Sequence, residues 1–205
     1  MAGTGLRERK KAATRTALSR AAFDLAMQRG LDSVTVDAIA ARADVSPRTF
    51  RNYFSSGEDA ILALLDEFEQ QLLDAFLKRD PSENVLDSIE AVILELVSSP
   101  GISEQTVGVA RLMREYPSLV AHSAVHRTNS ARLLVEIGHR TGMDPAKELY
   151  PRLLYRAASA ATTTVFELLS DSSHDTHSPS DLVRQGFAQL RFGLRQPLSS
   201  RTETA

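Results

Sequence analysis

Apolar residues recur at the 3.6-residue spacing of an α-helix along almost the whole of this 205-residue chain. We find no convincing run of alternating β-branched residues bounded by turn residues, which is the pattern of a strand. The sequence has no cysteine, so disulfides and thiolate metal sites are excluded and stability must come from packing. With 42% hydrophobic residues the chain can bury a core of ordinary size. We therefore predict an all-α fold of about nine helices.

The charged residues are distributed unevenly along the chain. Residues 1–54 contain ten Lys or Arg and five Asp or Glu, a net charge of +5, so the remainder must carry −7 to give the total of −2. No window approaches the roughly 18 uninterrupted apolar residues of a membrane span, and the charged N-terminus does not resemble a signal peptide. These patterns predict a cytoplasmic protein without membrane association, in which a basic first quarter precedes an acidic body.

Three helices are predicted in the basic first quarter. The first should run from about residue 8 to about residue 28 and end at Gly30. Thr35 is suited to cap the second helix, because its hydroxyl can accept a hydrogen bond from a free amide of the first turn. Ser46 is suited to cap the third, with Pro47 at the first helical position, where a missing amide costs nothing. We expect this third helix to continue to about Phe54.

The rest of the sequence predicts a helical body. A long amphipathic helix at about 58–79 should lead into it, and further helices are expected at about 83–98, 103–114, 117–140, 145–170 and 179–194. Pro151 removes one helical hydrogen bond, so we expect a kink or a fresh start there. The chain is thus divided into an N-terminal unit (1–54), a helical body (55–196) and a tail (197–205) that is predicted to be disordered.

The second and third helices are joined by a turn of about four residues, which is the plan of a helix-turn-helix motif. Phe50 and Phe54 are spaced i, i+4, so they share a face of the third helix, and this should be the buried face. Arginine binds guanine bidentately, asparagine suits adenine, and an apolar side chain can press on a thymine methyl. Side chains of these kinds occupy the opposite face: Pro47, Arg48, Arg51 and Asn52.

The order of residues resembles the DNA-binding region of TetR family transcriptional regulators (TetR/AcrR-like) over about 8–65. The matching stretches are T-V-D-A-I-A-A-R-A-D-V-S at 35–46, T-F-R-N-Y-F at 49–54 and E-D-A-I-L at 58–62. The chain departs from the family pattern at Arg51, where an aromatic residue is usual, and at Gly57, where a phosphate-contacting lysine is common. The resemblance implies a sequence-specific DNA-binding regulator, expected to be a repressor that a small, largely hydrophobic ligand releases from its operator.

The resemblance also implies individual DNA contacts. Thr35, Thr49 and Tyr53 are expected at phosphates, and Pro47, Arg48 and Asn52 near base edges. The upstream basic residues, Arg15 among them, suggest an arm suited to the backbone or to an adjacent minor groove. The predicted DNA-binding residues are Arg9, Lys10, Lys11, Thr35, Ser46, Pro47, Arg48, Thr49, Arg51, Asn52 and Tyr53.

A homodimer is expected, because specific binding usually needs two half-sites and hence a palindromic double-stranded operator. TetR-like proteins generally dimerise through a four-helix bundle built from the last two helices of each chain. The apolar stripes of the last two predicted helices supply the candidate interface: Leu154, Ala161, Val165, Leu168, Val183, Phe187, Leu190 and Leu194. The alternative is that these stripes are internal core, as some of them must be.

Helical bundles place ligand cavities between their helices, and the body is several times larger than DNA binding requires. The candidate lining residues are polar or polarisable groups within otherwise apolar helices: Met113, Tyr116, His122, His126, Asn129, Tyr155 and Thr162. A ligand that tilts the helix at about 58–79, the obvious mechanical link, would change the separation of the two recognition helices.

Catalysis and metal binding find no support in the sequence. His122 and His126 have a spacing that suits zinc, but a third ligand is missing, and no catalytic triad or phosphate-binding loop is evident. We predict no enzyme activity, no cofactor and no metal. The alternative is an all-α small-molecule-binding protein or enzyme that retains the helix-turn-helix fold without using it on DNA, for which Gly57 and Arg51 are the indications.

Overall fold

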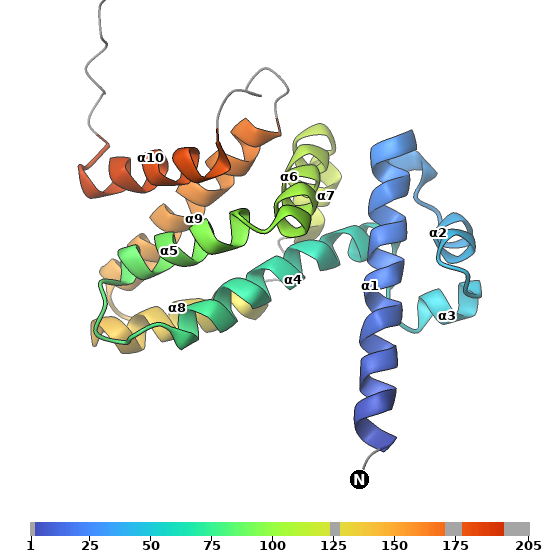
Figure 1. Ribbon diagram of the computed structural model, residues 1–205, viewed down its shortest axis with the longest axis horizontal. Helices are drawn as coiled ribbons and strands as arrows, with labels where there is room; N and C mark the ends of the chain where they lie inside the picture. The colour runs from blue at the N-terminus through green and yellow to red at the C-terminus, as the bar shows by residue number, and fades with distance from the viewer. Residues whose placement is uncertain (1–2, 124–127, 171–177, 195–205) are drawn as a thin grey trace, which may run out of the picture.

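The computed structural model describes residues 3–123, 128–170 and 178–194, so the tail predicted over 197–205 lies outside the described residues. Within these ranges the regular elements are all helical, which confirms the predicted all-α class. In Figure 1, α1 stands at one side with α2 and α3 against it, and α4 leads from this unit to the other helices. The α-helices are α1 (Gly3–Arg29), α2 (Val36–Arg42), α3 (Pro47–Arg51), α4 (Gly57–Lys78), α5 (Val85–Val97), α6 (Pro100–Glu115), α7 (Pro117–Ser123), α8 (Thr128–Thr141), α9 (Leu149–Leu169) and α10 (Pro179–Arg191), with a short 3-10 helix at Leu31–Ser33.

The helix boundaries differ most clearly from the predicted ones in four places. α3 ends at Arg51 with Asn52 as its C-cap, so Phe54 lies beyond the helix that was expected to reach it. α1 begins at Gly3, earlier than expected, so the basic N-terminal residues are helical. The helix predicted at 117–140 corresponds to α7 and α8, and residues 124–127 between them are not among those described. α9 begins at Leu149, which puts Pro151 in its first turn and confirms the expected fresh start, because proline is tolerated there without a lost hydrogen bond.

The N-terminal unit closes over an apolar core that continues into the body. Leu18 and Ala22 of α1, Ile39 of α2 and Phe50 of α3 have no exposed surface. The same cluster takes in the first two turns of α4 and side chains from α6 and α7. Burying one large apolar side chain stabilises the fold by about 1.5–3 kcal/mol. The unit is therefore packed directly against α4, α6 and α7, rather than held by a linker.

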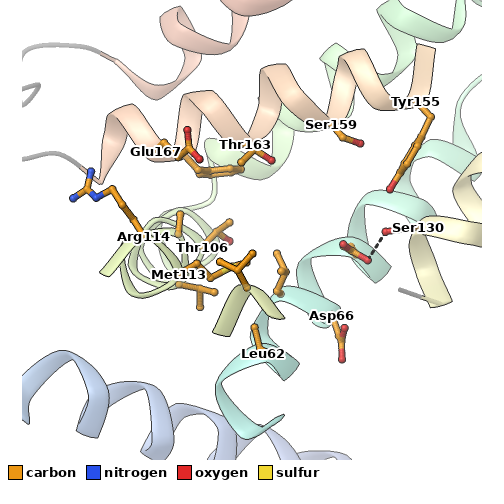
Figure 2. A pocket seen from close by; sticks show the side chains of 16 residues that line it. Leu62, Asp66, Thr106, Met113, Arg114, Ser130, Tyr155, Ser159, Thr163 and Glu167 are labelled. Atoms are coloured by element: carbon orange, nitrogen blue, oxygen red, sulfur yellow. Dashed lines mark hydrogen bonds between the residues drawn. The ribbon is translucent and has the colours of Figure 1, made fainter. Parts of the chain in front are cut away.

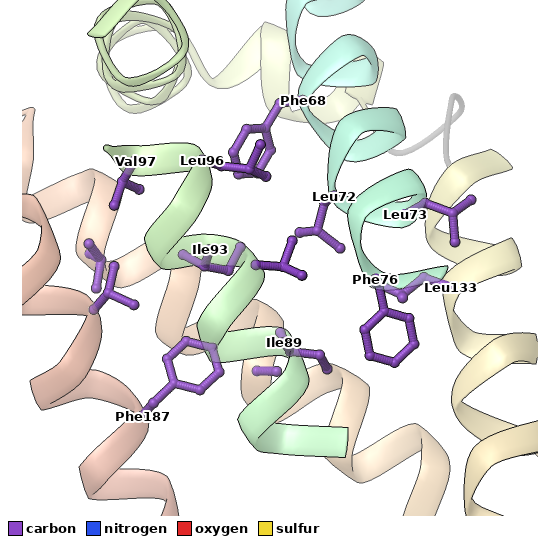
Figure 3. Close-up of a cluster of buried hydrophobic side chains, with 14 of the residues drawn as sticks. Phe68, Leu72, Leu73, Phe76, Ile89, Ile93, Leu96, Val97, Leu133 and Phe187 are labelled. Carbon is purple, nitrogen blue, oxygen red and sulfur yellow. The ribbon is translucent and has the colours of Figure 1, made fainter. Parts of the chain in front are cut away.

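A second core fills the body between α4, α5, α8, α9 and α10 (Figure 3). Phe76 of α4 and Phe187 of α10 are fully buried in it. Phe68 and Phe166 meet edge to face with ring centroids 5.5 Å apart, the arrangement that aromatic quadrupoles favour. α4 contributes to both cores, so it joins the N-terminal unit and the body mechanically.

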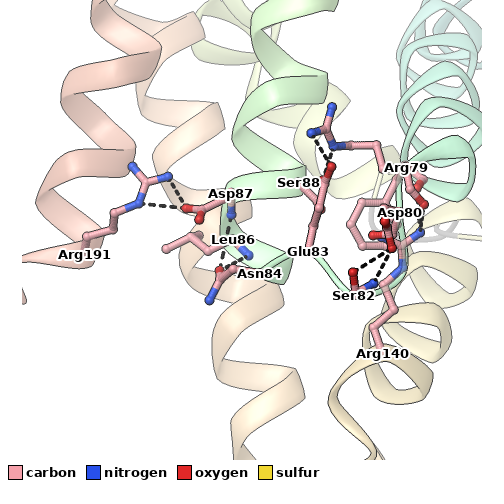
Figure 4. A network of polar contacts seen from close by, with 11 residues as sticks. Arg79, Asp80, Ser82, Glu83, Asn84, Leu86, Asp87, Ser88, Arg140 and Arg191 are labelled. Atoms are coloured by element: carbon pink, nitrogen blue, oxygen red, sulfur yellow. Dashed lines mark hydrogen bonds and ion pairs between the residues drawn. The ribbon is translucent and has the colours of Figure 1, made fainter.

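A polar network holds the connection between α4 and α5 (Figure 4). The backbone N–H and the hydroxyl of Ser82 donate to Asp80 at 2.9 and 2.8 Å, and these hydrogen bonds lower the pKa of the Asp80 carboxyl below its ordinary 3.8. The Ser88 hydroxyl donates to Glu83 at 2.7 Å, and the Arg79 guanidinium donates to the same carboxylate at 2.6 and 2.9 Å. The hydrogen bond from Ser88, followed by that from Arg79, lowers the pKa of Glu83 below 4.5.

This network predicts a stability that depends on pH. A carboxyl whose pKa is lower in the folded state stabilises the fold above its unfolded pKa, and this contribution is lost as the pH falls through the folded value. We expect the thermal midpoint to fall as the pH drops below 4.5, and to fall less steeply in Glu83→Gln, which has no charge to lose at this position. Midpoints measured by circular dichroism between pH 7 and pH 3 test this. The control is Glu104→Gln, which removes an exposed carboxylate from α6. If the thermal midpoint depended equally steeply on pH in the two variants, the prediction would be contradicted.

Candidate functional site

Side-chain caps fix the starts of α2 and α3. The Thr35 hydroxyl accepts a hydrogen bond from the Ala38 N–H at 3.2 Å, and the Ser46 hydroxyl accepts one from the Thr49 N–H at 3.0 Å. Asp44 lies in the turn between the helices with a φ of 53°, a left-handed conformation that aspartate tolerates better than most residues. Both predicted caps are confirmed, and the two helices form a compact helix-turn-helix unit against α1.

α3 has one buried and one exposed face. Phe50 is 0% and Phe54 5% exposed, and their ring centroids lie 5.8 Å apart, as the i, i+4 spacing predicts. Arg48, Arg51 and Asn52 are exposed. The three side chains best able to bind bases and phosphates are therefore available to a partner, while the aromatic pair anchors the helix.

The other predicted contacts of this surface also take part in the fold. The hydroxyls of Thr35 and Ser46 serve as helix caps, and the Ser46 and Thr49 hydroxyls share a hydrogen bond of 2.8 Å. Pro47, Thr49 and Tyr53 are half-buried, so each keeps part of its surface open to solvent. These residues can contact DNA from a position that the fold has already fixed.

The basic N-terminal residues belong to a helix and not to an extended arm. Arg9, Lys10 and Lys11 are exposed in the first turns of α1, and the Arg9 guanidinium donates to the Gly5 carbonyl one turn earlier at 3.2 Å. Because the chain is hydrogen-bonded as a helix here, these charges project from a stiff rod beside α3 (Figure 1).

Arg15, which the sequence predicts to belong to the basic N-terminal arm, has a structural role. Its guanidinium donates to the Tyr53 carbonyl at 3.3 Å and lies 4.5 Å from the centroid of the Phe54 ring. A cation over an aromatic face is attracted by the ring quadrupole. Arg15 therefore fastens α1 to the end of α3, because its charge is held by partners that are distant in sequence.

Gly57, the second departure from the family pattern, is explained by close packing. It is buried at the start of α4, and a Cβ built on it would lie 2.6 Å from both Cγ1 and the carbonyl oxygen of Val34. A lysine does not fit at this position without displacing backbone. The absence of the usual lysine therefore reflects the close approach of Val34 to the start of α4.

We expect Gly57→Ala to lower the free energy of unfolding by about 1–3 kcal/mol, because overpacking forces a well-packed site to shift. Gly5→Ala is the matched control, since a Cβ there would meet nothing within 4 Å. Urea unfolding of the two variants measures the difference. A Gly57→Ala protein as stable as Gly5→Ala would show that Val34 and its backbone shift at no cost in free energy.

A cavity of about 520 Å³ opens in the body between α4, α6, α8 and α9 (Figure 2). Its walls include Leu62 and Leu65 of α4, Met113 of α6 and Phe166 of α9. A smaller space of about 140 Å³ lies next to it and shares several lining residues, Tyr155 among them. The joint volume falls within the range of small-molecule sites in proteins.

The predicted ligand residues divide into three groups. Met113 and Tyr155 line the larger cavity, and Asn129, Tyr155 and Thr162 line the smaller one. Tyr116 does not line either; it packs against the N-terminal core because it follows the last turn of α6. The side chain of His122 and the whole of His126 lie outside the described residues.

α4 and α9 add polar groups to the cavity that were not predicted from the sequence. Asp66 lies on one side, and Ser159 and Thr163 lie on the other (Figure 2). Glu69 of α4 also lines the cavity. Glu69 accepts a hydrogen bond from the Ser130 hydroxyl of α8 at 3.1 Å. The i, i+3 spacing of the two carboxylates on α4 was a signal, but it also fits an exposed helix face.

Three of the predicted dimer residues are core residues of the single chain. Val165 is 3% exposed, and Val183 and Phe187 are 0% exposed. α9 and α10 pack against each other and against α5 within one chain. The apolar side chains of Val165, Val183 and Phe187 are therefore buried between these helices. Among the remaining five, Leu154, Ala161, Leu168 and Leu190 are half-buried, and Leu194, just beyond α10, is 71% exposed.

Two negative observations apply to the described residues. Within ranges 3–123, 128–170 and 178–194, three or more potential metal-binding side chains do not come together at any point. In the same ranges, no helix has the length and apolar character needed to cross a membrane.

A helix-turn-helix unit with an exposed, cationic recognition helix, packed on a helical body that contains a partly open cavity, defines a DNA-binding transcriptional regulator. Residues 18–64 match the family model described as bacterial regulatory proteins, tetR family, and residues 83–195 match the MftR C-terminal domain. The chain belongs to the TetR family of transcriptional regulators.

Individual relatives agree with this assignment. The chain is 28% identical over 172 residues to the HTH-type transcriptional regulator TcmR of Streptomyces glaucescens, covering 80% of this chain and 76% of that protein. The fatty acid degradation regulator FadR from Bacillus halodurans has a similar fold, with a TM-score of 0.60, 18% identity and coverage of 89% and 97%. A putative TetR-family regulator from Mesorhizobium loti gives a TM-score of 0.54 at 16% identity, covering 89% and 96%. The two solved structures show that the fold of this chain is shared with other regulators.

Proposed function

We propose that this protein is a cytoplasmic repressor that binds a palindromic operator as a homodimer and is released when a small, largely hydrophobic ligand fills the body cavity. One observation carries the proposal: α4 and α6 line the cavity and also pack against the helix-turn-helix unit. A ligand between these helices can therefore bind one orientation of the unit better than another, which is what allosteric release requires.

Two contacts support a direct route from α6 to the DNA-binding unit. A Cβ built on Gly108 would lie 2.4 Å from Cζ of Phe23, so α1 rests on the backbone of α6. Tyr116, just after α6, has its hydroxyl 3.0 Å from where a Cβ of Gly30 would stand. On the same helix, Ala110 and Met113 face the cavity. Two helices, α4 and α6, therefore connect the cavity to the helix-turn-helix unit, whereas the sequence indicated α4 as the obvious link.

The dimer is proposed to form where apolar side chains of α9 and α10 remain exposed. Leu149 and Leu153 at the start of α9 are 74% and 56% exposed, and Phe192 and Leu194 after α10 are each 71% exposed. The start of α9 and the end of α10 lie at the same end of the body (Figure 1). Large exposed apolar side chains gathered at one end of a body are typical of protein interfaces. A monomeric mass by light scattering at micromolar concentration would contradict the dimer.

The DNA-binding part is tested by a gel shift with the DNA upstream of the protein's own coding region. We expect preference for this DNA over random sequence, and weaker binding as salt is added, because phosphate contacts release counterions. Equal binding to both DNAs would contradict sequence-specific regulation. The alternative, a helix-turn-helix fold without a DNA role, loses one of its two indications because Gly57 is explained by packing.

The ligand site is tested by filling it. Ala110→Trp places an indole in the cavity, whereas Glu104→Trp on the same helix adds it to the exposed surface. With the hydrophobic dye 1-anilinonaphthalene-8-sulfonate as the probe, we expect fluorescence enhancement with the wild type and with Glu104→Trp, and little with Ala110→Trp, because apolar pockets bind apolar probes. Equal enhancement in both variants would place dye binding outside the cavity.

A further inference from the structure

Four hydroxyl groups that line the body cavity make no hydrogen bond within the described part of the chain. They belong to Thr106 of α6 and to Tyr155, Ser159 and Thr163 of α9 (Figure 2). Thr106 is only 8% exposed. Among the described residues, no side-chain oxygen or nitrogen is sealed off without a partner, so the Thr106 hydroxyl reaches the cavity space. A buried polar group that the fold itself does not pair needs a partner from elsewhere.

The hydroxyls of α9 pass over the partner that a helix offers them. A helical Thr or Ser can donate to the carbonyl four residues earlier. Thr141 does so to Ile137 at 2.8 Å, and Thr162 does so to Ala158 at 2.9 Å. Thr163 directly follows Thr162, yet within the described fold it does not donate to the carbonyl of Ser159. Its hydroxyl is therefore left for a group in the cavity.

The three hydroxyls of α9 form a row. Tyr155, Ser159 and Thr163 are four residues apart, so they share a face of the helix, with about 6 Å between neighbours and about 12 Å from first to last along the axis. Tyr155 and Ser159 are half-buried and Thr163 is exposed, so the row runs from the interior to the open side. The other walls carry apolar side chains, including Leu62, Leu65, Val109 and Met113. The cavity thus has one polar edge and apolar faces.

The charged groups of the cavity have other contacts or lie at its open side. Glu69 accepts a hydrogen bond from Ser130 at 3.1 Å, and Asp66 also has a partner within the chain. Arg114 and Glu167 are exposed, and Arg114 donates to the carbonyl that ends α9 at 3.4 Å. The groups that remain for a ligand in the interior are therefore neutral hydroxyls.

We propose that the cavity takes a neutral, elongated ligand whose rigid apolar skeleton carries several hydroxyl or carbonyl oxygens along one edge, with Thr106 and Thr163 among their hydrogen-bond partners. This inference rests on the proposed function and names the chemical class of its ligand. A hydroxyl both donates and accepts, so it pairs with either kind of oxygen. Oxygens on a rigid skeleton suit a row fixed on a helix, because a flexible chain would lose conformational freedom on binding.

A bare hydrocarbon of the same shape is the ligand that this cavity should bind less well. It would displace water from the hydroxyls without replacing its hydrogen bonds, which loses affinity. Sites built to bond a ligand hydroxyl reject analogues that lack it for the same reason.

The test uses two probes with one skeleton and the full-length protein. Resveratrol is a stilbene with three hydroxyls, and trans-stilbene has none. Equilibrium dialysis gives the dissociation constant of each for the wild type, for Thr106→Val and Thr163→Val, and for the two changes together. The matched control is Thr164→Val, because Thr164 is exposed on α9 next to Thr163 and is not part of the cavity lining.

We expect the wild type to bind resveratrol roughly tenfold more tightly than stilbene, since each hydrogen bond contributes roughly 2- to 12-fold in affinity. Each single change should reduce this preference by a factor in the same range, and the double change should remove most of it. Thr164→Val should keep the wild-type preference. The thermal midpoint should stay the same or rise in Thr106→Val, because its hydroxyl makes no hydrogen bond within the described fold.

Three outcomes would overturn the inference. A wild type without preference for resveratrol, including one that binds neither probe, would mean that the ligand class is wrong. A preference retained in the double variant would mean that these hydroxyls are not the contacts. A lower thermal midpoint in Thr106→Val would mean that its hydroxyl serves the fold. In each case the dye experiment with Ala110→Trp still decides separately whether the cavity binds ligands, so the proposed function does not fail with the ligand class.

Discussion

Replacing Arg140 with methionine is expected to lower the free energy of unfolding by about 3 kcal/mol, the largest stability effect that we predict for a single polar residue. The Arg140 side chain is 2% exposed, although it is charged. Its guanidinium donates to the carbonyls of Phe76 and Arg79 at 2.7 and 3.3 Å, at the end of α4 (Figure 4). It also pairs with Glu136 at 3.2 Å and lies 4.0 Å from the centroid of the Phe76 ring.

Methionine keeps the apolar contact with Phe76 but leaves the carbonyls of Phe76, Arg79 and Asp80, and the Glu136 carboxylate, without this donor. Unpaired partners of a buried charge are costly. Arg132→Met on the same helix is the control, because Arg132 is exposed and surface changes usually stay within about 0.5 kcal/mol. Denaturant unfolding of both variants gives the comparison. Equal stability of the two would show that the end of α4 does not depend on Arg140.

Arg48→Ala is expected to remove most of the preference for the operator over random DNA. A bidentate arginine–guanine pair discriminates by about 1–3 kcal/mol, and a dimer with two half-sites would lose it twice, about 2–6 kcal/mol in all. The residue is exposed on α3, and the buried Phe50 sets the direction of that face. Fluorescence anisotropy with upstream and random duplexes measures the ratio of affinities.

Lys10→Ala is the functional control for Arg48→Ala. It should weaken binding to both duplexes alike, because a phosphate contact is independent of sequence. If Arg48→Ala also weakened both alike, Arg48 would be a phosphate contact and not a base contact.

Features set by neighbours in sequence were predictable. The caps Thr35 and Ser46 act on amides three residues away, and the pair Phe50 and Phe54 is one helical turn apart. The helix-turn-helix and its exposed face follow from such local rules. The all-α class followed from periodicity in the same way.

Features set by distant partners were not predictable. Arg15 has its acceptor 38 residues away, and a lone arginine in a basic run gives no sign of it. Phe187 and Val183 form the stripe that a dimer helix would have, but the stripe does not reveal whether its partner helix is in the same chain. The cavity brings together Asp66, Ser130 and Thr163 from three helices, so its lining depends on the tertiary arrangement.

The contact of Phe23 with the backbone at Gly108 makes α1 a lever. Lys10 lies 13 residues before Phe23, about 20 Å along the helix axis. A tilt of roughly 5° about this fulcrum, as α6 adjusts to a ligand, would carry Lys10 through roughly 2 Å. The amplification lies in the length of α1: a movement too small to disturb the packing of the body becomes a displacement large enough to break a hydrogen bond at the far tip.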